Sequence, residues 1–173
     1  MNKSELRKIQ KEKLSRIKNK AEQEEKILAQ LFLDNWFIDA KTVATTMSTA
    51  IEFDTAKIRQ SQKRILLPRI VGTKMEFIEI HPETEFDTSA FGIQEPIGEV
   101  FKGEPDLVIV PGLAFNLLGD RLGFGKGYYD SCLKDNKVPT ISLVLNEQLV
   151  DDIPVDDHDI TINKIYTTNA TSF

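Results

Sequence analysis

Apolar residues recur at helical spacing through the first part of the chain, and Lys, Arg and Glu fill the positions between them. These apolar positions are Leu6, Ile9, Leu14, Ile17, Ala21, Leu28 and Leu31. Residues spaced in this way share one face of a helix, and that face packs on the rest of the protein. The pattern predicts one long helix at residues 4–33, or two helices in series, with Ser4 as the candidate N-cap.

Shorter runs of apolar or β-branched residues predict the strands of a sheet. They lie at residues 42–47, 64–70, 74–80, 107–110, 140–145 and 160–165. The run 107–110 is apolar throughout and lies between Asp106 and Pro111, which is typical of a strand buried on both faces of a parallel sheet. Pro68 predicts that its strand leaves regular pairing early, because proline has no N–H to donate.

The remaining segments predict a short helix and a long loop. Asp54 or Thr55 is placed to cap a helix that runs to about Lys63. Residues 83–105 are polar and turn-prone, which inside a compact domain is typical of a functional or mobile loop. No linker divides the 173 residues, so we expect one domain, residues 1–173. Its predicted fold is a three-layer α/β domain with a mostly parallel sheet flanked by helices.

A glycine-rich stretch, RLGFGKGYYD, occupies residues 121–130. Glycine permits positive φ and lets a ligand approach the backbone, so that successive N–H groups can converge on phosphate oxygens. A predicted helix at 128–134 would direct its first amides to the same place, and Arg121 and Lys126 add positive charge. The stretch predicts an anion site. An ordinary turn is the alternative, because the spacing matches neither the dinucleotide fingerprint nor the P-loop.

Residues 111–130, PGLAFNLLGDRLGFGKGYYD, resemble the signature of the 5-formyltetrahydrofolate cyclo-ligase (5,10-methenyltetrahydrofolate synthetase) family, in which PGLAFD, RLG-x-G and GYYD form the nucleotide site. Residues 3–7, KSELR, are similar to the family's K-x-x-L-R motif. The resemblance implies catalytic roles for Arg121, Lys126 and Tyr128. It implies an ATP site made by Lys3, Arg7, Arg121, Leu122, Gly123, Phe124, Gly125, Lys126, Gly127, Tyr128 and Tyr129.

Further similarities imply a folate site. Residues 49–55 resemble the family's E-[VI]-[DE]-T segment, Pro68-Arg69 resembles its PR, and residues 91–96 resemble an aromatic residue followed by a proline-bearing turn. The implied substrate-binding residues are Met47, Glu52, Arg69, Met75, Phe91, Phe124 and Tyr128. Two alternatives stay open: Glu52 as a first-turn acid of the following helix, and Met75 as a core residue.

An acidic cluster near the end of the chain, which includes Asp156 and Asp157, is by itself typical of a solvated loop. The cluster resembles the family's late D-x-x-[VI], whose first Asp joins that of GYYD at magnesium. The resemblance therefore implies that Asp130 and Asp159 hold Mg²⁺, with phosphate oxygens and waters completing an octahedron. The sequence departs from the family at Asn116 and Asn163-Lys164, where acids are usual, and at Ser131, where Arg is common.

Composition excludes several other classes of protein. An apolar content of 40% and a charged content of 28% are those of an ordinary globular domain, and no apolar run is long enough to cross a bilayer. The charged N-terminus lacks the apolar region of a secretory signal. Cys132 is the only cysteine, so an internal disulfide is excluded and a reducing cytoplasm is expected. His81 and His158 have no Cys/His cluster around them in the sequence, which argues against zinc.

The resemblance implies ATP- and Mg²⁺-dependent conversion of 5-formyltetrahydrofolate, as mono- or polyglutamate, to 5,10-methenyltetrahydrofolate, ADP and phosphate, through a phosphorylated formyl group. It also implies a domain similar to the sugar-phosphate isomerases and CoA transferases, and we expect a monomer. One alternative is a catalytically weak nucleotide- or folate-binding protein of the same fold. Another is a nucleic-acid-binding module, because residues 1–20 hold eight Lys or Arg against two Glu. No aromatic interleaving or binding motif accompanies that charge, so we expect no nucleic-acid and no membrane partner.

Overall fold

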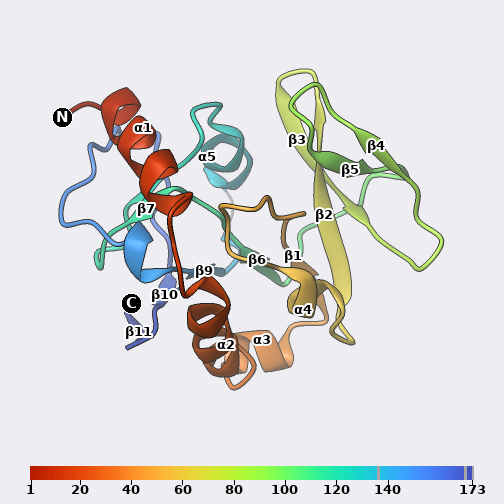
Figure 1. Cartoon of the computed structure of the whole chain (residues 1–173). Coiled ribbons are helices and arrows are strands. Elements are labelled where there is room, and N and C mark those ends of the chain that lie inside the picture. Colours follow the sequence, from red (N-terminus) through yellow and green to blue (C-terminus); the bar gives the residue numbers. More distant parts are fainter. Residues whose placement is uncertain (136, 170, 173) are drawn as a thin grey trace.

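A seven-stranded sheet forms the centre of the computed structural model, which describes residues 1–135, 137–169 and 171–172 (Figure 1). The strand order is β11-β10-β9-β6-β1-β2-β3. Strands β10, β9, β6, β1 and β2 run parallel, and β3 and β11 add an antiparallel strand at each edge. The strands are β1 (Thr42–Ala44), β2 (Arg64–Val71), β3 (Lys74–Glu79), β6 (Leu107–Ile109), β9 (Thr140–Leu143), β10 (Lys164–Tyr166) and β11 (Thr171–Ser172).

Helices cover both faces of this sheet and complete the three predicted layers. Leu107 and Ile109 of β6 pack in one buried cluster with residues of α2, α3 and α4, whereas Val108 between them packs in a second cluster with Leu133 of α5. This alternation is the period of two that a strand imposes. The expectation of a single α/β domain with a mostly parallel sheet is confirmed. The helices are α1 (Lys3–Leu14), α2 (Lys20–Leu31), α3 (Asn35–Asp39), α4 (Ala56–Arg59), α5 (Tyr128–Leu133) and the 3₁₀ turn η1 (Asn146–Gln148).

The first helical segment is divided into α1 and α2, as the second of the two sequence alternatives predicted. The prediction of Ser4 as N-cap is wrong, because Asn2 has that role. The Asn2 side chain accepts a hydrogen bond from Glu5 N at 2.8 Å, and the Glu5 carboxylate accepts one from Asn2 N at 3.2 Å. This reciprocal capping box satisfies two backbone donors that a helix leaves free.

Several element boundaries differ from those predicted. The first strand ends at Ala44, α4 ends at Arg59, and the last strand of the parallel set is Lys164–Tyr166 instead of 160–165. The prediction about Pro68 is wrong for β3, with which β2 pairs as far as Val71, although pairing of β2 with β1 does end at Leu66. Proline is tolerated here because β1 has already ended on that side of β2.

The segment predicted as a long loop, residues 83–105, contains a small hairpin. Its strands are β4 (Phe86–Thr88) and β5 (Gln94–Pro96), and they pair only with each other. Arg69 of β2 holds this hairpin against the sheet, because its guanidinium donates to Pro96 O at 2.8 Å and lies 3.8 Å from Asp87 Oδ2. No helix within the described residues combines the length and apolar composition needed to span a membrane.

Asp34 joins the start of α3 to β10 through a buried cluster of polar contacts. Its Oδ1 accepts from Trp36 N at 2.8 Å and Phe37 N at 3.2 Å, and its Oδ2 accepts from Lys164 Nζ at 2.9 Å and from the Tyr166 hydroxyl. Burial raises the pKa of Asp34, but the hydrogen bonds from Tyr166, Lys164 and Phe37 outweigh it and hold the pKa below its ordinary 3.8. The carboxylate is therefore ionised and stabilising at neutral pH.

Replacing Asp34 by Ala should lower the free energy of unfolding by about 3–5 kcal/mol at pH 7, because the change removes a helix cap and the partner of a buried ammonium. A depressed carboxyl pKa stabilises above the unfolded value and ceases to do so as the pH falls through the folded value. The difference from wild type should therefore shrink below about pH 3.8. Urea denaturation at several pH values measures this difference in the free energy of unfolding.

Asp39→Ala, a change at an exposed residue at the end of α3, is the control and should alter the free energy of unfolding by less than about 0.5 kcal/mol. Equal stability of Asp34→Ala and wild type at pH 7 would contradict the assignment.

Candidate functional site

The loops that follow β1, β6 and β9 meet at one edge of the sheet, because the carboxyl ends of neighbouring parallel strands lie together. The loop after β6 is the longest of the three. It folds back on itself as a two-stranded ladder, β7 (Ala114–Phe115) with β8 (Arg121–Leu122), before the glycine stretch leads into α5. Gly125 and Gly127 have φ of 108° and 70°, in the left-handed region that favours glycine. Both positions therefore need glycine for the loop to turn into α5.

Arg121 lies beneath this loop and not on its surface. The residue is 7% exposed, its Nε donates to Pro111 O at 2.6 Å, and its guanidinium lies 5.3 Å from the centre of the Tyr129 ring. Asp130 Oδ1 stands 3.7 Å from a terminal nitrogen of the guanidinium. Burial lowers the pKa of Arg121, and the negative potential of Asp130 opposes that shift.

The buried guanidinium also accounts for Gly123. A Cβ at this position would meet three atoms of the Arg121 guanidinium at 2.8–3.2 Å. A side chain at position 123 would therefore have to displace the Arg121 guanidinium. The sequence predicted Arg121 as a positive charge at the anion site, and the structure shows it buried beneath the glycine stretch. A direct contact of Arg121 with ATP stays a prediction.

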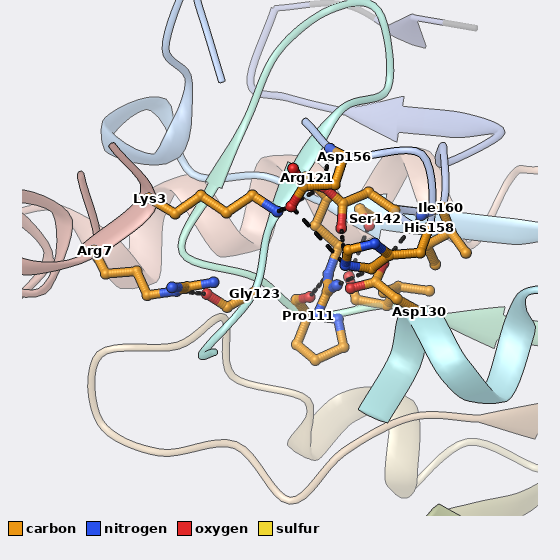
Figure 2. Close-up of polar contacts among 12 residues, drawn as sticks. Lys3, Arg7, Pro111, Arg121, Gly123, Asp130, Ser142, Asp156, His158 and Ile160 are labelled. Atoms are coloured by element: carbon orange, nitrogen blue, oxygen red, sulfur yellow. Dashed lines mark hydrogen bonds and ion pairs between the residues drawn. The ribbon is translucent and has the colours of Figure 1, made fainter. Parts of the chain in front are cut away.

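The first helix brings two cations to the same region (Figure 2). Arg7 Nε donates to Gly123 O at 2.9 Å, so α1 lies against the glycine stretch. Lys3 Nζ donates to Asp156 Oδ2 and to Asp159 Oδ2, both at 2.7 Å. Burial lowers the pKa of Lys3, but the hydrogen bonds from Lys3 to the two carboxylates prevail and raise it above its ordinary value.

Asp159 is the more enclosed of the two acids, with a side chain 9% exposed against 55% for Asp156. Burial raises the pKa of Asp159, yet the hydrogen bonds from Lys3 and from Asp156 N and the charge of Lys3 together lower it. Its Oδ1 lies 3.7 Å from His158 Nε2, and ligand atoms of Asp156, His158 and Asp159 all lie within 4.8 Å of one another. The group carries concentrated negative charge that the Lys3 ammonium balances.

The two residues predicted to hold magnesium are brought close together by the chain itself. Asp130 Oδ1 accepts from Ile160 N at 3.0 Å, and Ile160 is the residue after Asp159. Both side chains offer the hard oxygen donors that Mg²⁺ prefers, and phosphate and water oxygens would complete its octahedron. The donor set at Asp130 and Asp159 therefore fits the ion. Magnesium would supply charge neutralisation at the phosphates when bound.

The residues predicted to bind folate are only partly assembled. Phe91, at the turn of the β4–β5 hairpin, stacks under Lys126, whose Nζ lies 5.6 Å from the ring centre. Met47 and Met75 pack against the clusters on opposite faces of the sheet, and Arg69 is engaged with the hairpin. Phe124 and Phe91 are both exposed, at 41% and 72%. The structure therefore links the hairpin to the glycine stretch but does not gather all seven residues around one cavity.

Glu52 does line a small pocket at the carboxyl edge of the sheet. The pocket has a volume of about 20 Å³ and lies among Thr45, Pro111 and Gln148. Thr49 N and Thr49 Oγ1 donate to Glu52 Oε1 at 3.0 and 2.7 Å. This contact is local to the turn, and the alternative of Glu52 as a first-turn acid of α4 is not observed, because α4 begins at Ala56.

Tyr129 carries a buried hydroxyl that has no hydrogen-bond partner within the described part of the chain. Burial raises the pKa of Tyr129, the Arg121 cation lowers it, and the Glu52 carboxylate raises it again. The phenol therefore stays protonated at neutral pH and keeps an O–H available for donation. The centre of its ring lies 5.3 Å from the guanidinium of Arg121.

Two of the three sequence departures have structural roles here. Asn116 Oδ1 accepts from Leu118 N and Asp120 N, both at 3.0 Å, and its Nδ2 donates to Asp120 Oδ2 at 3.0 Å. An amide suits this turn because it can donate to the Asp120 carboxylate. Asn163 Oδ1 accepts from Thr140 N at 2.9 Å and so ties β10 to β9. The third departure, Ser131, is exposed on α5.

Gln10 and Gln148 are site-supporting residues that sequence reasoning missed. Gln10 Nε2 donates to Leu113 O at 2.9 Å and Glu147 O at 3.1 Å, and Gln148 Nε2 donates to Gly112 O at 2.9 Å. Both therefore fix carbonyls of the loop after β6. A signal for Gln10 existed, because it stands midway between Leu6 and Leu14 at helical spacing and so lies on the buried face.

The fold and site define an α/β protein in which a glycine loop, cations from the first helix and a pair of carboxylates meet beside a parallel sheet. Such an edge is where α/β proteins bind ligands. The sequence profile of the 5-formyltetrahydrofolate cyclo-ligase family matches residues 1–168. The chain belongs to that family.

Individual proteins agree with the family assignment. A probable 5-formyltetrahydrofolate cyclo-ligase of Caenorhabditis elegans is 29% identical over 94% of this chain and 91% of its own length. The 5-formyltetrahydrofolate cyclo-ligase of Escherichia coli K12 is 31% identical over 74% and 78%. The NMR structure of Aquifex aeolicus 5,10-methenyltetrahydrofolate synthetase superposes with a TM-score of 0.86 at 32% identity, over 99% of this chain and 92% of that one.

Arg121→Lys should lower the free energy of unfolding by about 1.5–3 kcal/mol. Lysine has no N–H at the Nε position to donate to Pro111 O, and its ammonium cannot replace the planar guanidinium. Chemical denaturation compares the variant with Arg16→Lys, a change at a side chain 76% exposed that should cost almost nothing. Unchanged stability of Arg121→Lys would show that the guanidinium does not support the loop.

Proposed function

We propose that this chain catalyses the ATP- and Mg²⁺-dependent conversion of 5-formyltetrahydrofolate to 5,10-methenyltetrahydrofolate, with release of ADP and phosphate. The observation that carries the proposal is the meeting of Lys3 and Arg7 from α1 with the glycine stretch and Asp159, in a chain that matches the cyclo-ligase family over residues 1–168. The relatives named above are themselves cyclo-ligases or methenyltetrahydrofolate synthetases, which supports the same activity here.

The reaction needs ATP because an amide oxygen is a poor leaving group. The formyl oxygen attacks the γ-phosphorus, and the bond to ADP breaks. The lone pair of N10 then attacks the activated formyl carbon, N10 gives up its proton to the phosphate or to water, and phosphate leaves with the former formyl oxygen. Phosphoryl transfer of this kind depends on alignment and on neutralising charge more than on a protein nucleophile.

The charged residues of the site divide these tasks according to exposure. Lys126 is exposed at the surface of the glycine stretch and is free of carboxylates in the ion pairs of the described residues, so we assign it to the transferred phosphoryl group. Arg7 and Lys3 approach from α1 and would close over the triphosphate. Arg121 acts from below by holding the loop and Asp130 in place. Carboxylates Asp130 and Asp159 would hold the magnesium ion.

Folate would lie between the Glu52 pocket and the β4–β5 hairpin. Glu52 offers a carboxylate to ring N–H groups, and Phe91 offers an exposed aromatic face next to Lys126. This position would set the formyl group near the phosphates on the glycine stretch. Tyr128, which follows Gly127 directly at the start of α5, is assigned to both ligands, since it lies where the two would meet.

The alternative of a catalytically weak binding protein rested on the departures at Asn116, Ser131 and Asn163. Asn116 and Asn163 are engaged in turn and strand contacts, and Ser131 faces solvent, so none removes a charged group from the site as assembled. The departures therefore do not favour the alternative. A monomeric state, a cytoplasmic location and the absence of nucleic-acid partners stay predictions.

The direct test is to mix the purified protein with MgATP and 5-formyltetrahydrofolate and to follow the near-ultraviolet absorbance of the methenyl product. A rise in absorbance that requires ATP, with matching release of phosphate, is expected. A flat trace under conditions where ATP still binds would overturn the proposal in favour of a binding protein.

Lys126→Ala should reduce kcat/KM about 100-fold, because it removes a cation from the phosphoryl group in transit. Its stability should change by less than about 0.5 kcal/mol, since the side chain is exposed. Lys134→Ala, an equally exposed lysine just after α5, is the matched control and should turn over like wild type. If the two variants had the same activity, Lys126 would have no role in phosphoryl transfer.

A further inference from the structure

Thr45 follows directly on β1 and carries a hydroxyl for which the described residues provide no hydrogen-bond partner. The residue is 1% exposed, and its backbone N donates to Leu66 O at 3.0 Å, so the backbone N–H is satisfied while the side-chain hydroxyl is not. A buried hydroxyl without a partner destabilises a fold, and native proteins leave few of them without a reason.

Thr45 lines the pocket that also holds Glu52. Two other buried side chains of the pocket already have hydrogen-bond partners. Gln148 accepts from Leu145 N and donates to Gly112 O, both at 2.9 Å. Thr55 Oγ1 donates to Thr46 O and accepts from Arg59 Nε at 3.0 Å. Within the described residues, Thr45 therefore carries the one fully buried side-chain oxygen of the pocket that lacks a partner, and Glu52 carries the pocket's carboxylate, of which Thr49 engages only Oε1.

This pair of groups specifies the chemistry of what it meets. A carboxylate accepts from N–H donors, and a hydroxyl can donate to a carbonyl oxygen beside them. A volume of about 20 Å³ has room for about one water-sized atom and not for a ring, so only the edge of a heterocycle can enter. The 2-amino-4-oxopyrimidine ring of a reduced folate presents such an edge, with two N–H groups next to one carbonyl oxygen.

We propose that the Thr45 hydroxyl is a specificity-determining group that donates to the 4-oxo group of the folate ring while Glu52 accepts from its N–H groups. The inference rests on the proposed function and adds a residue to it. It also explains why the Thr45 hydroxyl is unsatisfied in the unliganded protein, because the bound ligand would supply its hydrogen-bond partner.

Thr45→Val tests the inference, since valine conserves the volume and removes the hydroxyl. Calorimetric titration with 5-formyltetrahydrofolate in the absence of ATP should show about tenfold weaker binding, the factor for losing one hydrogen bond. KM for ATP should stay at the wild-type value, and the Tm of the free protein should be equal or higher, because an unsatisfied hydroxyl is gone. Thr45→Ser, which keeps the hydroxyl, should bind 5-formyltetrahydrofolate like wild type.

A folate analogue with hydrogen in place of the 4-oxo group supplies a readout that a purely structural role would not move. Wild type should prefer the 4-oxo ligand by more than about tenfold, because the analogue also lacks the N3 proton that Glu52 accepts, and Thr45→Val should narrow this preference by about tenfold. If wild type binds and converts 5-formyltetrahydrofolate but Thr45→Val retains the full preference for the 4-oxo ligand, the inference is wrong and the proposed function stands. If wild type neither binds nor converts it, the proposed function fails and the inference fails with it.

Discussion

The candidate site depends on one constraint: the buried cation of Arg121 must find its hydrogen-bond and charge partners within the protein. A guanidinium out of contact with water is stable only when its hydrogen bonds and charge are matched by the protein. Here the carbonyl of Pro111, the ring of Tyr129 and the carboxylate of Asp130 provide that match. These contacts hold the end of β6, the glycine stretch and α5 in one arrangement. Glycine at position 123 leaves space for the Arg121 guanidinium.

The second constraint is the docking of α1, which carries cations from the far end of the sequence. Leu6 packs with Ala114, Leu122 and Ile153, and Gln10 donates to Leu113 O. These contacts set the height and rotation of the helix, so that Arg7 reaches Gly123 O and Lys3 reaches Asp159. The helix thus joins the two parts of the chain that hold the phosphate-binding loop and the late acids.

Much of the fold was predictable, because its signals are local. The run 107–110 is apolar at every position, and such a run suits a central parallel strand whatever its neighbours are. The capping box at Asn2 and Glu5 was also visible as a spacing of three residues, although the sequence analysis chose Ser4 instead. The β4–β5 hairpin gave no such signal, because its strands are short, largely polar and stabilised by a distant arginine, Arg69.

The sequence predicted which residues belong to the candidate site better than it predicted how they are arranged in space. The family motif named Arg121, Asp130 and Asp159, but burial of Arg121 depends on partners that only the folded chain assembles. The unsatisfied hydroxyl of Thr45 had no sequence signal, since a β-branched residue after a strand is commonplace. Pairing of Asp130 with the backbone next to Asp159 likewise follows from how the loop 156–163 crosses α5.

A crystal structure with Mg²⁺ and a non-hydrolysable ATP analogue tests the central claim most directly. The account predicts the triphosphate between α1 and the glycine stretch, in contact with Lys126 and with Lys3 or Arg7, the metal on Asp130 and Asp159, and Arg121 still beneath the loop. A triphosphate bound elsewhere, or one that draws Arg121 out from Pro111 O to contact its phosphates, would contradict it.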